Sequence, residues 1–134
     1  MRKLFFLLII QFMTLQTVVY GQFFFTVELM DDNVTYTVKV RPDESFPEPT
    51  NFTSSMQVGF TVPTGGFKPS SDVNSINGNW TISSTHNAPS ENPDFDYIAF
   101  ELSGGKDNIA YIANEETDLF SFENIGECLS LIHI

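Results

Sequence analysis

The residues that follow position 21 alternate between apolar and polar side chains, and this pattern constrains the fold more than any other feature. In the clearest run, Val34, Tyr36, Val38 and Val40 alternate with threonine, lysine and arginine. Successive side chains of a β-strand point to opposite faces, so such a run predicts a strand with one buried face. No convincing stripe with the 3.6-residue period of an amphipathic helix occurs there, which indicates an all-β fold.

The same alternation predicts further strands. The apolar positions that mark these strands are Phe23, Phe25, Val27 and Leu29; Met56, Val58, Phe60 and Val62; Ile76, Trp80 and Ile82, in a strand interrupted by Gly78; and Ile98, Phe100 and Leu102. Two shorter runs cover residues 109–113 and 119–123. Asp31-Asp32-Asn33 predicts a hairpin turn between the first two strands, and Pro63-Thr64-Gly65-Gly66 ends the third.

Together these runs predict an antiparallel β-sandwich of the jelly-roll or Ig-like Greek-key type, with about seven to nine strands. Two connections, residues 42–53 and 84–96, are long and contain prolines. Such loops either carry function or cross between the sheets. A closed barrel is the alternative architecture, but long polar connections suit a sandwich better.

The start of the chain predicts a signal peptide over residues 1–21. Two basic residues at positions 2–3 precede an almost wholly apolar stretch at 4–13. Val19 and Gly21 are acceptable at the positions that signal peptidase reads, so cleavage is expected between Gly21 and Gln22. The apolar stretch is shorter than the roughly 20 residues that span a bilayer, which makes a retained anchor the weaker alternative.

The domain expected after cleavage, residues 22–128, is strongly acidic. It keeps four basic residues in a sequence with 17 acidic residues. The four are Lys39, Arg41, Lys68 and Lys106. Such a charge repels nucleic acid and anionic membranes, so we expect no nucleic-acid partner and membrane contact only through the export signal.

Groups suited to catalysis are scarce. The two histidines are His86, in a polar stretch expected to be a loop, and His133, near the end of the chain. His86 lacks the context of a Ser–His–Asp triad, and Cys128 has no base except His133. A domain this small also offers no obvious cleft for the two acids of a glycosidase. We therefore expect no enzyme. Since Cys128 is the one cysteine, no internal disulfide can form in this sequence, which suggests either an intermolecular bond or a partner cysteine lost by truncation.

The acidic residues suit calcium better than catalysis, because hard cations prefer carboxylate and amide oxygens. Asp94 and Asp96 place two carboxylates on the same side of an extended segment, and Asp72 with Asn74 forms a similar pair. The competing interpretation is that these side chains cap turns and keep the protein soluble. No cofactor other than calcium is expected.

Two aromatic residues are candidates for stacking on a sugar ring. Trp80 is the single tryptophan, and its alternation with Asn79 and Thr81 is also typical of a core residue between two sheets. Tyr97 lies on the opposite face from Ile98, so we expect it to be exposed.

Four stretches carry a resemblance to known proteins. They are Val34–Val40 (VTYTVKV), Ser55–Gly65 (SMQVGFTVPTG), Pro93–Phe100 (PDFDYIAF) and Leu119–Cys128 (LFSFENIGEC). With them the chain resembles N-terminal modules of large secreted proteins of Bacteroidota, which are similar to the cohesin and cellulose-binding-module group of jelly-roll β-sandwiches. The resemblance implies a fold and an extracellular location, often upstream of adhesion repeats, and carries no catalytic signature.

Residues 129–134 (LSLIHI) depart from this resemblance, which implies a further strand after Cys128. They resemble a translated sequencing-adaptor tail, so we expect the natural protein to be longer. A genuine short final strand is the alternative.

These observations predict a secreted or cell-surface module that binds protein or glycan ligands, for adhesion or assembly, without catalysis. Two alternatives stay open: a polysaccharide-binding module and a structural spacer.

Overall fold

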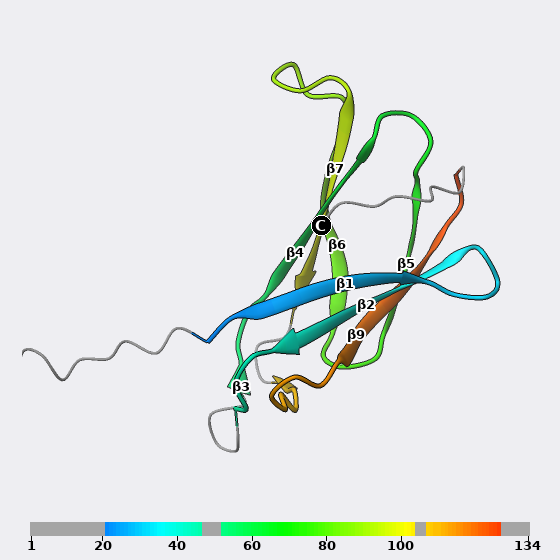
Figure 1. Cartoon of the computed structure of the whole chain (residues 1–134). Helices are drawn as coiled ribbons and strands as arrows, with labels where there is room; N and C mark the ends of the chain where they lie inside the picture. The colour runs from blue at the N-terminus through cyan, green and yellow to red at the C-terminus, as the bar shows by residue number, and fades with distance from the viewer. Residues whose placement is uncertain (1–20, 47–51, 104–106, 127–134) are drawn as a thin grey trace, which may run out of the picture.

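The computed structural model describes residues 21–46, 52–103 and 107–126, and its regular elements in these ranges are all β-strands. Seven strands of seven or eight residues form two antiparallel sheets (Figure 1). In spatial order, the four-stranded sheet contains β1 (Phe23–Leu29), β2 (Thr35–Pro42), β9 (Thr117–Asn124) and β5 (Pro69–Ser75). The three-stranded sheet contains β4 (Gln57–Pro63), β7 (Phe95–Leu102) and β6 (Trp80–His86). A short pair joins β3 (Phe52–Thr53) to β8 (Asp107–Asn108). The predicted all-β sandwich is confirmed.

Aromatic rings fill the space between the two sheets. Phe100 on β7 is fully buried, and its ring centroid lies 4.8 Å from those of both Phe120 and Phe122 on β9. Phe60 on β4 meets Phe100 edge-on at 5.4 Å. Each such ring removes a large apolar area from water, so a small domain can form its core without a disulfide.

The alternation predicted for β4 and β7 is confirmed. The buried residues of these two strands include Val58, Phe60, Val62, Ile98, Phe100 and Leu102. Both strands pair in continuous antiparallel register from Gln57 opposite Glu101 to Pro63 opposite Phe95.

A tight hairpin joins β1 to β2, as Asp31-Asp32-Asn33 predicts. Asn33 has a left-handed φ of 59°, which asparagine tolerates. The Asp32 carboxylate accepts hydrogen bonds from the Thr35 hydroxyl and from the backbone N–H groups of Val34 and Thr35. These bonds, that of the Thr35 hydroxyl first, lower the pKa of Asp32. Val34 belongs to this turn and is 45% exposed, so the prediction that it faces the core is wrong.

β5 does not show the alternation of apolar and polar residues, because it contains Ser70, Ser71 and Asp72 in succession. It lies at the outside of the four-stranded sheet, where polar side chains reach solvent. The strand predicted across Ile76, Trp80 and Ile82 with an interruption at Gly78 begins only after that glycine, so the prediction is wrong for Ile76. The chain leaves β5 at Ser75 and turns through Gly78, whose φ is 86°, before β6 begins at Trp80. Ile76 lies in this connection and is exposed.

Two further boundaries differ from the prediction. Residues 109–113 form no strand, and Tyr111 makes an isolated bridge to Phe46 instead. The Tyr111 hydroxyl lies 3.0 Å from that of Thr53, and burial raises the pKa of Tyr111. His86 is the last residue of β6, opposite Tyr97, and not part of a loop.

The expected signal peptide, up to Tyr20, and the C-terminal tail lie outside the described residues, as does Cys128. At the expected cleavage site, Gly21 is exposed, and Gln22 donates its backbone N–H to the Asp43 carboxylate at 2.8 Å. Within the described ranges no helix is long and apolar enough to cross a membrane.

Candidate functional site

A groove opens where β5 bends away from β9. Pro69 lies opposite Asn124 and Val73 lies opposite Phe122, so three residues of β5 face the single residue Glu123. Extra residues on one strand form a β-bulge, which interrupts the ladder and bends the strand. The groove therefore follows from the pairing of β5 with β9, and we call it the β5–β9 groove.

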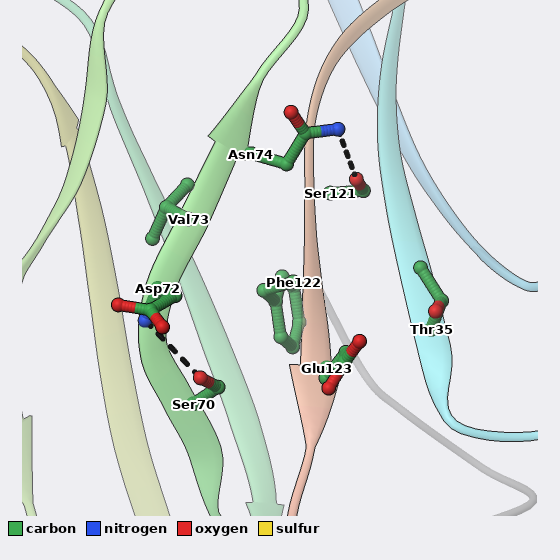
Figure 2. Close-up of a pocket in the computed structure, with 8 residues that line it drawn as sticks. All are labelled: Thr35, Ser70, Asp72, Val73, Asn74, Ser121, Phe122 and Glu123. Atoms are coloured by element: carbon green, nitrogen blue, oxygen red, sulfur yellow. Dashed lines mark hydrogen bonds between the residues drawn. The ribbon is translucent and has the colours of Figure 1, made fainter.

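Polar side chains from three strands line the β5–β9 groove, which has a volume of about 420 Å³. Its lining residues are Thr35, Ser70, Asp72, Val73, Asn74, Ser121, Phe122 and Glu123. Figure 2 shows the carboxylates of Asp72 and Glu123 on neighbouring strands, with Phe122 between them. Because both carboxylates lie at one opening, this surface can accept hydrogen bonds or hold a cationic group.

Two hydrogen bonds organise the groove, and both are drawn in Figure 2. The Asn74 side-chain amide donates to the Ser121 hydroxyl at 3.2 Å, which ties β5 to β9 above the bulge. The backbone N–H of Asp72 donates to the Ser70 hydroxyl at 3.1 Å, which holds the bulge itself. No lysine, arginine or histidine belongs to the described lining, so the two carboxylates lack a basic neighbour there.

A second hollow lies on the outer face of the three-stranded sheet, and we call it the β7 trough. Gly59 on β4 lies opposite Ala99 on β7, and these two small residues leave a trough of about 310 Å³. Tyr97 and His86, which are opposite each other, also line it. A Cβ atom added at Gly59 would meet no other protein atom within 4 Å. The Tyr97 hydroxyl accepts a hydrogen bond from the Asn92 amide at 2.7 Å, which positions the ring.

Trp80 is not available to a ligand, so its proposed stacking role is wrong. The side chain is 2% exposed, and its ring centroid lies 4.7 Å from that of Phe120. The indole N–H donates to the backbone oxygen of Asn77 at 2.7 Å, which satisfies its one polar atom. Tyr97, the other stacking candidate, is partly exposed in the β7 trough.

The four residues predicted to bind calcium separate into two places. Asp72 and Asn74 both line the β5–β9 groove. Asp94 is exposed, whereas Asp96 lies within β7 and is 5% exposed. The Asp96 carboxylate accepts hydrogen bonds from the backbone N–H groups of Ala88, at 2.8 Å, and Gly65, at 3.2 Å.

Asp96 therefore holds two connections together, which is a structural use of the carboxylate. In the described ranges no group of three or more histidine, cysteine, aspartate or glutamate side chains is placed to hold a metal ion. Calcium binding stays a prediction from the sequence.

Several residues that line these two surfaces are not among those predicted from the sequence. Ser121 and Glu123 alternate with Phe120 and Phe122, and this alternation indicates that they lie on the opposite face of β9 from the two rings. Gly59 interrupts an otherwise apolar–polar strand, and a glycine inside a strand often marks a close approach by a ligand or backbone. The bulge that opens the β5–β9 groove lies in a mostly polar strand, so no alternation of apolar residues in the sequence indicates it.

Comparisons with protein-family models, with curated proteins and with solved structures find no match to this chain.

Proposed function

We propose that the chain is a non-catalytic binding module of an extracellular or surface protein, and that the β5–β9 groove holds a basic, extended segment of a partner protein. The observation that carries this proposal is the pair of carboxylates, Asp72 and Glu123, at one opening with no basic residue in the lining. The secreted location rests on the predicted signal peptide at residues 1–21.

The shape of the groove supports an extended ligand. The bulge separates β5 from β9 opposite Glu123, so backbone groups there are accessible beside the side chains. An extended peptide can use such backbone groups for affinity and the flanking side chains for specificity. The acidic charge of the whole chain would also speed its encounter with a basic partner.

The test uses a short peptide of alternating lysine and threonine as the probe, with binding followed by amide chemical shifts. The variant Asp72→Asn/Glu123→Gln should weaken binding about tenfold or more, because both charged contacts are removed. The matched control is Glu44→Gln/Glu91→Gln, which makes the same change in net charge at two exposed positions outside the groove. Equal losses in the two double variants would show attraction to net charge alone and would overturn the proposal.

A second candidate function, polysaccharide binding, is favoured by the β7 trough. Sugar rings pack against aromatic faces, and Tyr97 lies beside a hollow floored by Gly59 and Ala99. Hydroxyl and imidazole groups from Ser84 and His86 also line the trough and can hydrogen bond to sugar hydroxyls.

Affinity electrophoresis in gels that contain soluble polysaccharides tests this second function. Tyr97→Ala should abolish any retardation, and Gly59→Leu should do the same by filling the trough. Tyr97→Phe, which keeps the ring and loses the bond to Asn92, is the matched control and should remain retarded. If the wild-type protein runs unretarded in every gel, and the lysine–threonine peptide also fails to bind, the structural spacer is the remaining function.

A further inference from the structure

The free edge of β1 is well prepared to pair with another strand. In the described part of the chain, β1 has β2 as its neighbour on one side and lies at the outside of the sheet (Figure 1). Its register with β2 runs without a shift from Phe23 opposite Pro42 to Leu29 opposite Tyr36. β1 also contains no proline, no lysine and no bulge, which are the usual protections of an edge strand.

The positions of the hydrogen bonds show which backbone groups of β1 face outward. Met30 donates its N–H to the Thr35 oxygen, and the Gln22 oxygen accepts from Asp43. Hydrogen-bonded pairs alternate along an antiparallel ladder, so the even-numbered residues between these two bonds also pair with β2. Phe23, Phe25, Val27 and Leu29 therefore direct their N–H and C=O groups toward the free edge.

We infer that β1 pairs with β1 of a second copy of this chain, antiparallel about a two-fold axis at Thr26. This register uses all seven residues of β1, because it sets Phe23 against Leu29 and Phe25 against Val27 of the second copy. The hydrogen-bonded pairs are then Phe23 with Leu29 and Phe25 with Val27, and these are the residues whose N–H and C=O groups point toward the free edge. Thr26 meets Thr26 of the second copy in a non-hydrogen-bonded pair.

Side chains on both faces of the sheet suit this register. On the inner face, Phe25, Val27 and Leu29 are partly buried against the core, and the second copy would cover the area that they still expose. On the outer face, the Arg41 guanidinium lies 5.4 Å from the centre of the Phe24 ring. The pairing sets Phe24 opposite Glu28 of the second copy.

Charge also favours a second copy as the occupant. All ion pairs found among the described residues involve Lys39, which binds Glu28, Glu116 and Asp118, and none involves Arg41. Arg41 lies on β2 opposite Phe24, one strand from the free edge, and the two-fold axis brings the Glu28 carboxylate of the second copy, which its own Lys39 also binds, to the other side of Phe24. The symmetry makes this contact twice, which offsets part of the repulsion between two acidic chains.

Disulfide cross-linking tests the register directly. All variants carry Cys128→Ser, which removes the one native thiol. Thr26→Cys should form a disulfide-linked dimer in air, because opposed residues of a non-hydrogen-bonded pair have Cα atoms about 4.5 Å apart. Asp31→Cys is the matched control, since it is exposed, makes none of the contacts proposed for the interface and lies more than about 20 Å from its own copy in this register, and it should stay reduced.

Sedimentation velocity gives the independent measurement on the wild-type chain. We expect a concentration-dependent monomer–dimer equilibrium, which Thr26→Glu weakens about tenfold or more by setting two carboxylates against each other at the axis. Thr26 is exposed, so this substitution leaves the core intact. A wild-type chain that remains monomeric at the highest attainable concentration, or equal cross-linking of Thr26→Cys and Asp31→Cys, would overturn the inference.

Discussion

The two outer strands of the four-stranded sheet, β1 and β5, differ in sequence and in the way they meet their neighbours. β5 begins with Pro69, contains serines and an aspartate, and bulges away from β9. β1 is rich in phenylalanine and keeps a continuous register with β2. One sheet therefore presents an interrupted edge beside a polar groove and a straight edge that can accept another strand. The pairing of each outer strand, more than its position, determines what its edge can bind.

The largest expected change in stability comes from the aromatic core, against which both β1 and β5 pack. Phe122 on β9 is 2% exposed, contacts the rings of Phe100 and Tyr36, and also lines the β5–β9 groove. Phe122→Ala should lower the free energy of unfolding by about 4 kcal/mol, because it leaves a cavity between the sheets. Denaturation with urea measures this change. A loss no larger than that of an exposed residue would show that the two edges do not share a single core.

The next prediction compares the two edges themselves. Phe25 on β1 and Val73 on β5 are both partly buried against the core. Phe25→Ala should cost about 2 kcal/mol and Val73→Ala about 1 kcal/mol at low concentration, in line with the apolar area that each removes.

At high protein concentration only the cost of Phe25→Ala should grow, because a dimer formed through β1 stabilises the folded state by mass action. Melting temperatures of both variants across a range of concentrations measure the difference. The same concentration dependence for both variants would contradict a specific role for β1.

A smaller effect is expected where β1 is anchored at its start. The Tyr111 ring packs 5.1 Å from that of Phe23, and its hydroxyl hydrogen bonds with Thr53 inside the protein. Tyr111→Phe should cost about 1 kcal/mol at neutral pH, since one buried hydrogen bond is lost and the Thr53 hydroxyl is left without this partner.

Tyr111 also gives a pH dependence. Burial raises the pKa of Tyr111 above its ordinary value of 10.0, so its contribution to stability is present below about pH 10 and is lost as the pH rises through the higher folded-state pKa. The hydrogen bond to Glu28 raises the pKa of Lys39, so the contribution of Lys39 to stability is also lost as the pH rises through its folded-state pKa. Unfolding measured at neutral and at alkaline pH should show a smaller alkaline loss for Tyr111→Phe than for the wild type.

The smallest effect is expected at the exposed turn that closes β1 onto β2. The Thr35 hydroxyl and two backbone N–H groups lower the pKa of Asp32, so its contribution is present above about pH 3.8 and is lost as the pH falls through the lower folded-state pKa. Asp32→Asn should reduce stability slightly at neutral pH and make no difference in strong acid. A constant difference between the two proteins at every pH would contradict this assignment.

The sequence predicted the elements in which burial follows simple alternation. β4 and β7 each bury one face against the aromatic core, and their apolar residues recur at every second position. β5 could not be found in this way, because it lies at the edge of the sheet and its side chains need not be apolar. The hairpin at Asp32 was predictable, since its hydrogen bonds are local to the turn.

The candidate sites were less predictable than the fold. The sequence predicted Asp72 and Asn74 as a pair of calcium ligands. The groove that they line was not predictable, because it depends on the bulge opposite Glu123, which lies 51 positions after Asp72 in the chain. Asp96 was predicted as a cation ligand, and the two backbone hydrogen bonds that it accepts, from Gly65 and Ala88, were not predicted. Both outcomes depend on how distant segments are paired, which local composition does not specify.

Amide hydrogen exchange along β1 tests the contrast between the two edges most directly. In this account, the N–H groups of Phe25 and Val27 face the free edge, whereas that of Thr26 is bonded to β2 in every copy. At high protein concentration we predict that Val27 exchanges as slowly as Thr26 in the wild type and rapidly in Thr26→Glu. Rapid exchange of Val27 in the wild type at every concentration, with Thr26 protected, would show that the edge of β1 stays unpaired and would contradict the account.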